Sequence, residues 1–472
     1  MILTSRLRPR HAGLPLALAL VAVPVACTGG GATSEGESDA TSTTKTTSST
    51  SDSASTGSST TATTAETTTT TTTATATTTE TTDTSETSTG TTGEPLPSDA
   101  VDILLVIDDS GSMSEEQALL SASLGALIEP LEAASIDYRI AITTTDAGNP
   151  RCPKAATTPP NGAFVLSSCV DRVEAGDFLF EGVDPPFDAS YACTDYCSAS
   201  DDAIVVTPTP TALDPEAKPR PWIEGGPGGS NISGLSQVAA LQCFVPQGIT
   251  GCGFESPLEA MYKALTRATT PGEANYGFLR DDASLLVLII TDETDCSYNP
   301  AHEEVFTTNK ALWNSPADPV PTSAVCWRAG VGCSGSSPSY DDCFPEHHTV
   351  DAAVTDSEQD AVLFPLSRYS DQLHQIADAK LAGKVELRLI AGVPSGYIDG
   401  AAIPYTESDP NYISDFGIDP ACVSDFGRAV PSVRERALAE ELSGGARTTH
   451  SICESDFGVA LDAAAKSVIG DP

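Results

Sequence analysis

Basic residues are scarce in this chain of 472 residues. It has 24 lysines and arginines against 65 aspartates and glutamates, which gives a formal net charge of −41 at pH 7. Such an acidic surface repels phosphate backbones and anionic headgroups, so we expect no nucleic-acid partner and no electrostatic binding to anionic membranes. The charge favours solubility and says little about the fold.

Sequence motifs of common enzyme classes are also missing. The chain has no Gly-x-Ser-x-Gly elbow, no His-Glu-x-x-His helix and no Walker loop. Asp-Phe-Gly occurs three times, but without the other kinase motifs, so we interpret two copies as turns and Asp456 of the third as a helix cap. The chain has no Cys-x-x-Cys pair, which argues against zinc ribbons and thioredoxin chemistry. We expect a protein that is not an enzyme; the enzymatic alternative is a hydrolase built from Ser110 or the inserts described below.

A long apolar run is missing as well. Basic residues precede an apolar stretch, Leu14 to Val25, that is too short to span a bilayer comfortably and is typical of an export signal. It ends in Val25-Ala26-Cys27, which resembles the lipobox of bacterial lipoproteins, although Pro24 stands where that pattern usually has Leu. We therefore expect residues 1–26 to be a lipoprotein signal peptide. Cys27 would anchor the exported chain to the cell envelope, at the outer membrane or the cell surface. The alternative is an ordinary signal peptide cleaved nearby.

Cysteine is plentiful by contrast. The chain has 13, and setting Cys27 aside leaves 12, an even number that can pair completely. In an exported chain these residues are read as disulfides. Connectivity stays open at this stage, and the plausible pairs are Cys422 with Cys453, Cys243 with Cys252, and Cys296 with Cys326.

Composition divides the chain at about residue 97. Residues 27–97 are almost entirely Thr, Ser, Ala, Gly and Glu, without apolar periodicity or aromatic residues. Such a segment does not bury enough apolar surface to offset its ordering entropy, so we expect a disordered tether. Residues 98–472 form the predicted folded domain.

Apolar runs and amphipathic stretches alternate in this domain. The runs predict core strands, and the amphipathic stretches predict helices. The predicted strands are 101–107, 138–143, 285–290 and 385–391, and the predicted helices are 114–133, 231–244, 257–268, 369–380, 433–442 and 456–469. Two Cys-rich inserts, about 146–229 and 296–366, interrupt this pattern, and 394–431 reads as irregular. The order implies an α/β fold with a doubly wound, mostly parallel sheet.

Oxygen-bearing side chains follow two of the predicted strands. Asp108, Ser110 and Ser112 come directly after the strand that ends at Ile107, and Asp292 follows the strand at 285–290. Parallel strands bring their C-terminal ends together, so one metal ion can touch both loops. Carboxylate and hydroxyl oxygens suit Mg²⁺ or Ca²⁺. The alternative is a metal-free loop in which Asp108 and Ser112 cap the following helix.

These residues resemble the von Willebrand factor A domain and its metal-ion-dependent adhesion site. The family's signature is Asp-x-Ser-x-Ser after the first strand, a Thr on a later loop, and an Asp after the fourth strand. Asp108 to Ser112 match the first element and Asp292 matches the last. The middle element departs, because Glu255 takes the Thr position, with Thr250 and Ser256 as nearby hydroxyl alternatives.

Glu255 changes the charge of the predicted site. Asp108 and Asp292 neutralise a divalent ion, and an ionised Glu255 brings the net charge to about −1, which disfavours an acidic ligand. Glu255 is either a fifth ligand that closes the site or a cap of the helix that begins at Pro257.

The resemblance implies metal-dependent adhesion. Both inserts leave from the C-terminal ends of strands, so they should flank the metal face, either as a specificity surface or as protective decoration. We expect a cell-envelope lipoprotein that uses a divalent cation to bind another protein or an extracellular polymer. The alternatives are a structural envelope protein whose metal only stabilises the fold, and the hydrolase.

Overall fold

The computed structural model describes residues 99–152, 158–181, 185–381 and 383–469. The predicted signal peptide, the predicted anchor Cys27 and the predicted tether lie outside these ranges. Within them, no helix combines the length and the apolar character needed to cross a bilayer.

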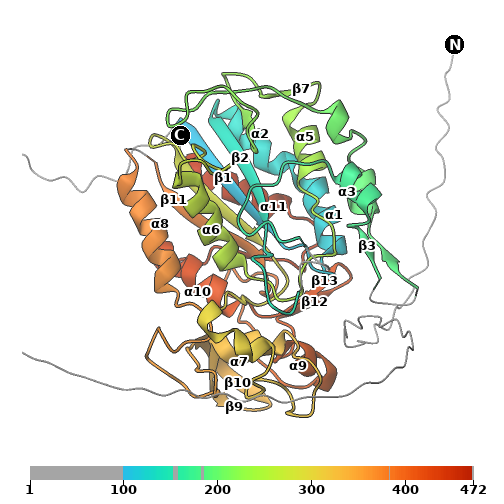
Figure 1. The fold of residues 1–472 in the computed structure, drawn as a ribbon, viewed down its shortest axis with the longest axis vertical. Helices are drawn as coiled ribbons and strands as arrows, with labels where there is room; N and C mark the ends of the chain where they lie inside the picture. Colours follow the sequence, from blue (N-terminus) through green and yellow to red (C-terminus); the bar gives the residue numbers. More distant parts are fainter. Residues whose placement is uncertain (1–98, 153–157, 182–184, 382, 470–472) are drawn as a thin grey trace, which may run out of the picture. The chain divides into compact units, whose positions relative to one another are not determined.

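A six-stranded sheet forms the centre of the fold (Figure 1). Its strand order is β14-β11-β8-β1-β2-β6, and every neighbouring pair is parallel except β2 with β6. Its strands are β1 (Ala100–Ile107), β2 (Asp137–Thr144), β6 (Ile223–Gly225), β8 (Ser284–Ile290), β11 (Val385–Ala391) and β14 (Thr449–Ser451). The predicted α/β class with a mostly parallel sheet is confirmed, and the two edge strands β6 and β14 are additions to it.

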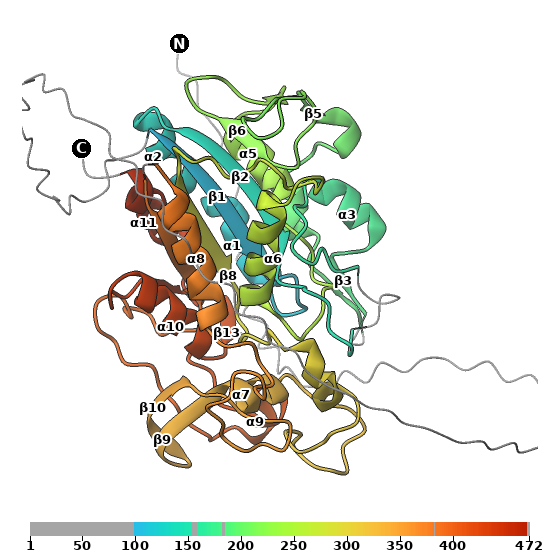
Figure 2. The ribbon, with the colours of Figure 1, turned by 60° about the vertical axis from the view of Figure 1, so that its left-hand side comes forward.

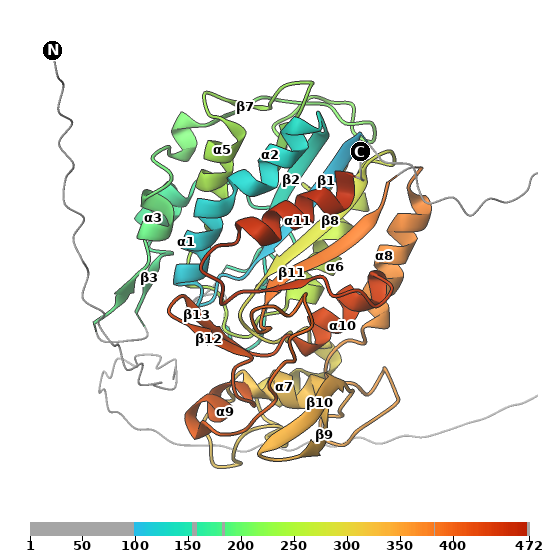
Figure 3. The same cartoon turned by 180° about the vertical axis from the view of Figure 1, so that it is seen from behind.

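Helices cover both faces of this sheet. The longer ones are α1 (Ser114–Ser123), α2 (Gly125–Ala133), α5 (Gln237–Phe244), α6 (Pro257–Thr269), α8 (Ser367–Ala379), α10 (Val433–Leu442) and α11 (Gly458–Ile469). Figure 3 shows α1, α2, α5 and α11 on one face of the sheet, where their apolar residues form one core; the apolar residues of α6, α8 and α10 form a second core on the other face. β1 serves both cores: Ile103 belongs to the first and Leu104 to the second, as alternation along a strand requires.

The predicted helix at 114–133 is two helices. α1 ends at Ser123 and α2 begins at Gly125. Between them the Leu127 N–H bonds to the Leu124 carbonyl, a tighter turn than the α-helix makes. Ser114 is the first helical residue and does not cap the helix, because the N-cap is Met113, which makes no side-chain cap hydrogen bond.

The predicted helix at 231–244 starts six residues late. Ile232–Ser233 is a short strand, β7, and Gly234 follows with a φ of +87° that an L side chain rarely adopts. Ser236 then caps α5 by accepting a hydrogen bond from the Ala239 N–H at 3.2 Å. Glycine and the cap therefore override the apolar pattern that runs through this segment.

Other helix predictions are confirmed with small shifts in their ends. α6 begins at Pro257, where its missing N–H costs nothing. α10 has the predicted bounds, and Asp456 accepts a hydrogen bond from the Gly458 N–H at 2.8 Å at the start of α11. The stretch 394–431 is less irregular than predicted, because it contains the helix α9 (Pro410–Phe416) and the hairpin of β12 (Cys422–Ser424) and β13 (Gly427–Ala429).

Both inserts contain short elements. The first holds α3 (Cys169–Ala175), β3 (Leu179–Phe180), β4 (Phe187–Asp188), α4 (Tyr191–Thr194), the 3₁₀ helix η1 (Asp201–Ala203), β5 (Val205–Val206) and the sheet strand β6. The second holds the 3₁₀ helix η2 (Pro300–Phe306), α7 (Ala324–Gly330), β9 (Val331–Ser336) and β10 (Ser339–Pro345). α7, α9 and the β9–β10 hairpin gather beyond one end of the central sheet (Figure 2).

Six disulfides pair the 12 cysteines other than Cys27. They join Cys152 to Cys252, Cys169 to Cys193, Cys197 to Cys243, Cys296 to Cys326, Cys333 to Cys343, and Cys422 to Cys453. The predicted pairs Cys422–Cys453 and Cys296–Cys326 are confirmed. Cys243–Cys252 is wrong, because Cys243 belongs to the core that α5 shares with Cys197, whereas Cys252 lies in the loop before α6.

Candidate metal site at the sheet edge

The candidate site lies where β1 and β8 end side by side. These strands pair in register up to Ile107 with Ile290, and the Asp108 N–H extends the pairing to the Ile290 carbonyl at 2.9 Å. Thr291 therefore lies next to Asp108, and its hydroxyl donates a hydrogen bond to Asp108 Oδ2 at 2.5 Å. The two strand ends therefore lie side by side, and a direct hydrogen bond between side chains joins them.

Hydroxyl groups continue this contact toward Asp292. The Ser110 N–H donates to Asp108 Oδ1 at 2.8 Å, which folds the loop back on the carboxylate. The Ser110 and Ser112 hydroxyls lie 3.1 Å apart, and the Ser112 hydroxyl donates to Asp292 Oδ1 at 3.1 Å. Four of the five predicted ligands, Asp108, Ser110, Ser112 and Asp292, thus belong to one connected group of oxygen atoms.

Burial shields this group of oxygen atoms almost completely from solvent. Asp108, Ser110 and Asp292 are 0%, 1% and 4% exposed, whereas Ser112 is exposed. The group therefore meets solvent mainly through Ser112. Gly111 lies between the two serines with the Phe180 ring close against its Cα, where a Cβ would come within 2.9 Å of that ring.

Glu255 lies beside this group, held by a residue that the sequence analysis did not select. Its Oε2 accepts a hydrogen bond from the Thr145 hydroxyl, and the Thr145 carbonyl accepts one from the Ser256 N–H at 3.0 Å. Within the described part of the chain, Glu255 Oε1 is buried without a hydrogen-bond partner. The hydroxyl alternative Ser256 is occupied elsewhere, because its side chain donates to the Cys296 carbonyl at 2.9 Å. Thr145 is the last of three consecutive threonines and directly follows β2. Its position at the end of a strand is the signal by which the sequence could have indicated it.

Burial and mutual repulsion raise the pKa values of these carboxyl groups. Burial, and then the neighbouring charge of Asp108, raises the pKa of Asp292 to about 8. Burial also raises the pKa of Asp108, and it raises the pKa of Glu255 well above its ordinary value, with Asp108 and Asp109 adding to the effect. A divalent cation at this edge would relieve the repulsion, because it favours the ionised form of every carboxylate near it.

The donor set suits a hard divalent cation. It comprises two carboxylates and two serine hydroxyls, with the unpartnered Glu255 Oε1 nearby, and oxygen is the ligand atom that Mg²⁺ and Ca²⁺ prefer. No three His, Cys, Asp or Glu side chains gather as a metal cluster anywhere in residues 99–152, 158–181, 185–381 and 383–469. A cation here would thus depend on hydroxyl oxygens as well as on Asp108 and Asp292. Direct ligation by Glu255 stays a prediction.

The β12–β13 hairpin borders the same edge. The Val430 N–H, just after β13, donates to the Asp292 carbonyl at 2.8 Å. Gly427 meets Glu116 of α1, where a Cβ would come within 2.0 Å of the Glu116 carboxylate. Arg428 is exposed, stacks on the Tyr412 ring at 4.5 Å, and lowers the pKa of Asp292 against the larger effect of burial. The sequence analysis missed Arg428, because nothing local marks residue 428 as a neighbour of residue 292.

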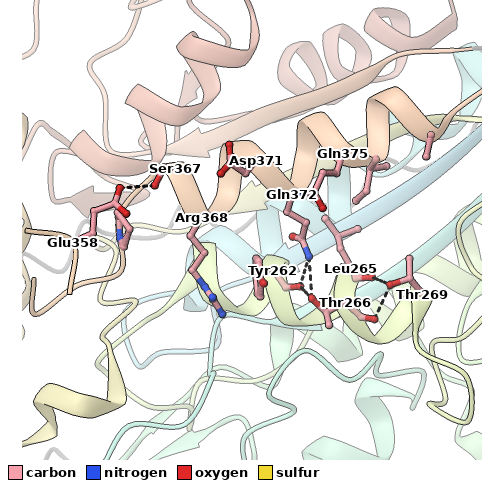
Figure 4. Close-up of a pocket in the computed structure, with 13 residues that line it drawn as sticks. Tyr262, Leu265, Thr266, Thr269, Glu358, Ser367, Arg368, Asp371, Gln372 and Gln375 are labelled. Carbon is pink, nitrogen blue, oxygen red and sulfur yellow. Dashed lines mark hydrogen bonds between the residues drawn. The ribbon is translucent and has the colours of Figure 1, made fainter. Parts of the chain in front are cut away.

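A separate groove of about 650 Å³ lies between α6 and α8 (Figure 4). Gln372 bridges the helices by donating to the Tyr262 carbonyl and the Thr266 hydroxyl at 3.0 and 2.9 Å. Arg368 lies over the Tyr262 ring and forms a bidentate contact with Glu259 at 3.0 and 3.1 Å. The charge of Arg368 is thus already matched, and the groove shares no lining residue with the predicted metal site.

Neither a protein-family model nor a curated protein matches this chain.

Proposed function

We propose that this protein is an exported, lipid-anchored binding protein of the cell envelope. Its folded domain, similar to a von Willebrand factor A domain, holds Mg²⁺ or Ca²⁺ and uses it to bind another protein or an extracellular polymer. Asp108, Ser110, Ser112 and Asp292 hold the ion, and Glu255 is the fifth ligand. Cys27 carries the lipid anchor, and the residues up to 97 act as a tether.

The observation that carries this proposal is the connected group of oxygen atoms between two adjacent parallel strands. The Thr291–Asp108 and Ser112–Asp292 hydrogen bonds bring both halves of the family signature together from positions 180 or more residues apart. Capping a helix does not require this contact, since Asp292 lies on a different strand. The switch in strand order beside β1 also favours ligand binding at this edge.

The second candidate is a cation that only stabilises the fold. It is favoured by the burial of Asp108, Ser110 and Asp292, which leaves Ser112 as the exposed member of the set. The hydrolase has less support. In the described residues the Ser110 hydroxyl contacts Ser112 and Asp108, and no histidine hydrogen-bonds to it to act as a base.

Thermal unfolding tests the metal site. The native chain should melt at a higher temperature in Mg²⁺ or Ca²⁺ than in EDTA, because a cation that binds the folded state alone stabilises it by mass action. Asp108→Asn and Asp292→Asn should lose this shift. Asp102→Asn is a matched control: Asp102 is equally buried at the other end of β1, paired with Arg280 at 2.8 Å, so that variant should melt earlier yet keep the shift.

Two results would count against the proposal. A native chain whose melting temperature is the same in cation and in EDTA has no metal site. A shift that persists in both Asp108→Asn and Asp292→Asn places the cation elsewhere. If the shift is present but partner capture is the same in EDTA, the cation is structural.

A further inference from the structure

Lys263 of α6 contacts the side chain of an asparagine in the first insert. Its Nζ donates hydrogen bonds to Asn161 Oδ1 at 2.7 Å and to the Ala147 carbonyl at 3.2 Å. Glu259 lies one helical turn before Lys263, and its Oε1 is 3.8 Å from Nζ. An amine, a carboxamide and a carboxylate therefore meet at one place, although Asn161 and Lys263 are 102 residues apart in sequence.

Backbone contacts hold Asn161 against α6. Its carbonyl accepts a hydrogen bond from Arg267 Nε at 3.1 Å, and its N–H donates to the Asp146 carbonyl at 3.2 Å. Gly162 follows with a φ of +78°, and a Cβ there would come within 2.6 Å of Lys263 Cβ, so glycine is needed for this close approach. The backbone of Asn161 is therefore fixed beside Lys263, and its short side chain keeps the carboxamide in contact with the amine.

The surroundings of Lys263 favour the reactive form of its amine. Only the neutral amine is a nucleophile, and a lysine reaches that form more readily where it is desolvated. Burial lowers the pKa of Lys263, against the charge of Glu259. The charges of Arg368 and Arg267 lower it further. The Lys263 side chain is 32% exposed and that of Glu259 is 6% exposed, so their contact is largely shielded from water.

We propose that Lys263 and Asn161 join in an intramolecular isopeptide bond, with Glu259 as the proton carrier. The neutral Nζ attacks Asn161 Cγ, and the bond from Cγ to the carboxamide nitrogen breaks. Glu259 takes the proton that Nζ loses and passes it to the departing nitrogen, which leaves as ammonia. One amide replaces another, so the reaction balances without an oxidant or a cofactor. It is independent of the proposed metal site.

Glu259 is held in place for this role. Arg368 contacts both of its carboxylate oxygens, at 3.0 and 3.1 Å, which keeps Glu259 ionised and able to accept a proton. The same pairing makes Glu259 a weaker base, so we expect the bond to form slowly. A reaction that takes place once in each folded molecule does not need a fast proton transfer.

The bond fastens the first insert to α6 beside an existing cross-link. The Cys152–Cys252 disulfide joins the same insert to the loop before α6. A reductant opens that disulfide and leaves an amide intact. The first insert therefore stays attached to α6 under conditions that reduce every disulfide of the chain.

Tryptic digestion of the full chain, after folding, reduction and alkylation, tests the bond by mass spectrometry. The native chain should yield a branched peptide that joins Asn161 to Lys263 and weighs one ammonia less than its two linear parts together. Lys263→Arg keeps the positive charge without a nucleophilic amine, and Asn161→Ala removes the carboxamide, so neither variant should yield it. Glu259→Gln keeps the shape and removes the proton carrier, so the branched peptide should accumulate about 100-fold more slowly or less.

A second reaction of Asn161 also releases ammonia and has to be distinguished. The backbone nitrogen of Gly162 can attack Asn161 Cγ and close a succinimide ring, but this leaves Lys263 open to trypsin and gives no branched peptide. Lys466→Arg is the matched control for the lysine change. Lys466 also pairs with a carboxylate four residues before it, Asp462 at 2.8 Å, but is 64% exposed, and its variant should form the branched peptide as the native chain does.

Three results would overturn the inference. The first is a native chain that yields no branched peptide after prolonged incubation in the folded state. The second is a loss of ammonia that persists unchanged in Lys263→Arg, which identifies the succinimide instead. The third, a branched peptide that forms equally fast in Glu259→Gln, removes Glu259 from the reaction. None of them bears on the proposed function, because Lys263→Arg should keep the cation-dependent melting shift of the native chain.

Discussion

Arg434 and Asp295 form an ion pair that anchors the loop after β8. Their Nε and Oδ2 atoms lie 3.0 Å apart, and both side chains are 0% exposed. Arg434 also donates to the Phe364 carbonyl at 2.6 Å, so it links the start of α10 to the second insert. Asp295 follows the predicted ligand Asp292 by three residues. Replacing Arg434 with Met keeps much of its volume and removes its charge.

The expected loss of unfolding free energy in Arg434→Met follows from the burial of Asp295, the carboxylate that remains. Without Arg434, Asp295 is a buried charge without its cation, and breaking such a pair costs about 3–5 kcal/mol of unfolding free energy. The same change at an exposed pair costs under about 1 kcal/mol. Lys466 and Asp462 are the matched control, since they lie 2.8 Å apart but are 64% and 40% exposed.

Urea unfolding in EDTA, with the disulfides intact, measures both costs. Arg434→Met should lose several times the free energy that Lys466→Met loses. The double variant Arg434→Met with Asp295→Asn should recover part of the loss, because it leaves no charge unpaired. A loss below about 1 kcal/mol for Arg434→Met, or a double variant less stable than the sum of its single changes, would refute the reasoning.

Two further predictions concern other parts of the chain. Burial, with the Asp295 charge second, raises the pKa of Glu435 to about 8, so the folded state holds a proton that the unfolded state releases near pH 4.5. That contribution is complete below about pH 4.5 and is lost as the pH rises through about 8; Glu435→Gln should therefore flatten the fall in unfolding free energy between pH 5 and 9, measured by urea titration, and an unchanged slope would contradict the assignment. At the N-terminus, Cys27→Ser should abolish acylation and release the protein from the membrane fraction on cell fractionation. Retention of that variant in the membrane fraction would argue against the lipid anchor.

The sequence predicts the central strands because their signals are local and strong. Leu285 to Ile290 is an unbroken apolar run, and all of β8 is buried. The Asp108 loop is recognisable because Asp108, Ser110, Gly111 and Ser112 lie within five residues directly after an apolar strand. Once β1 and β8 pair as parallel neighbours, Asp292 after β8 lies beside the Asp108 loop after β1. The part of the candidate site that the sequence predicts therefore depends on the pairing of two continuous strands.

Long-range contacts account for what the sequence left out. The Thr145–Glu255 hydrogen bond joins residues 110 apart, and the Cys152–Cys252 disulfide spans 100 residues. Sequence alone leaves connectivity open, and the predicted pair Cys243–Cys252 is one of the many pairings that 12 cysteines allow. The core around α5 decides otherwise, because it places Cys243 with Cys197. Edge strands of three residues such as β14 carry too little pattern to be found.

The candidate metal site and the hairpin beside it therefore depend on different information. Asp108, Ser110 and Ser112 are placed by the end of one strand, and a change elsewhere in the chain leaves their spacing intact. Arg428 reaches the same edge only because the Cys422–Cys453 disulfide and the Asp292 carbonyl hold its hairpin there. The oxygen atoms proposed to hold a cation and the β12–β13 hairpin can thus vary independently in sequence.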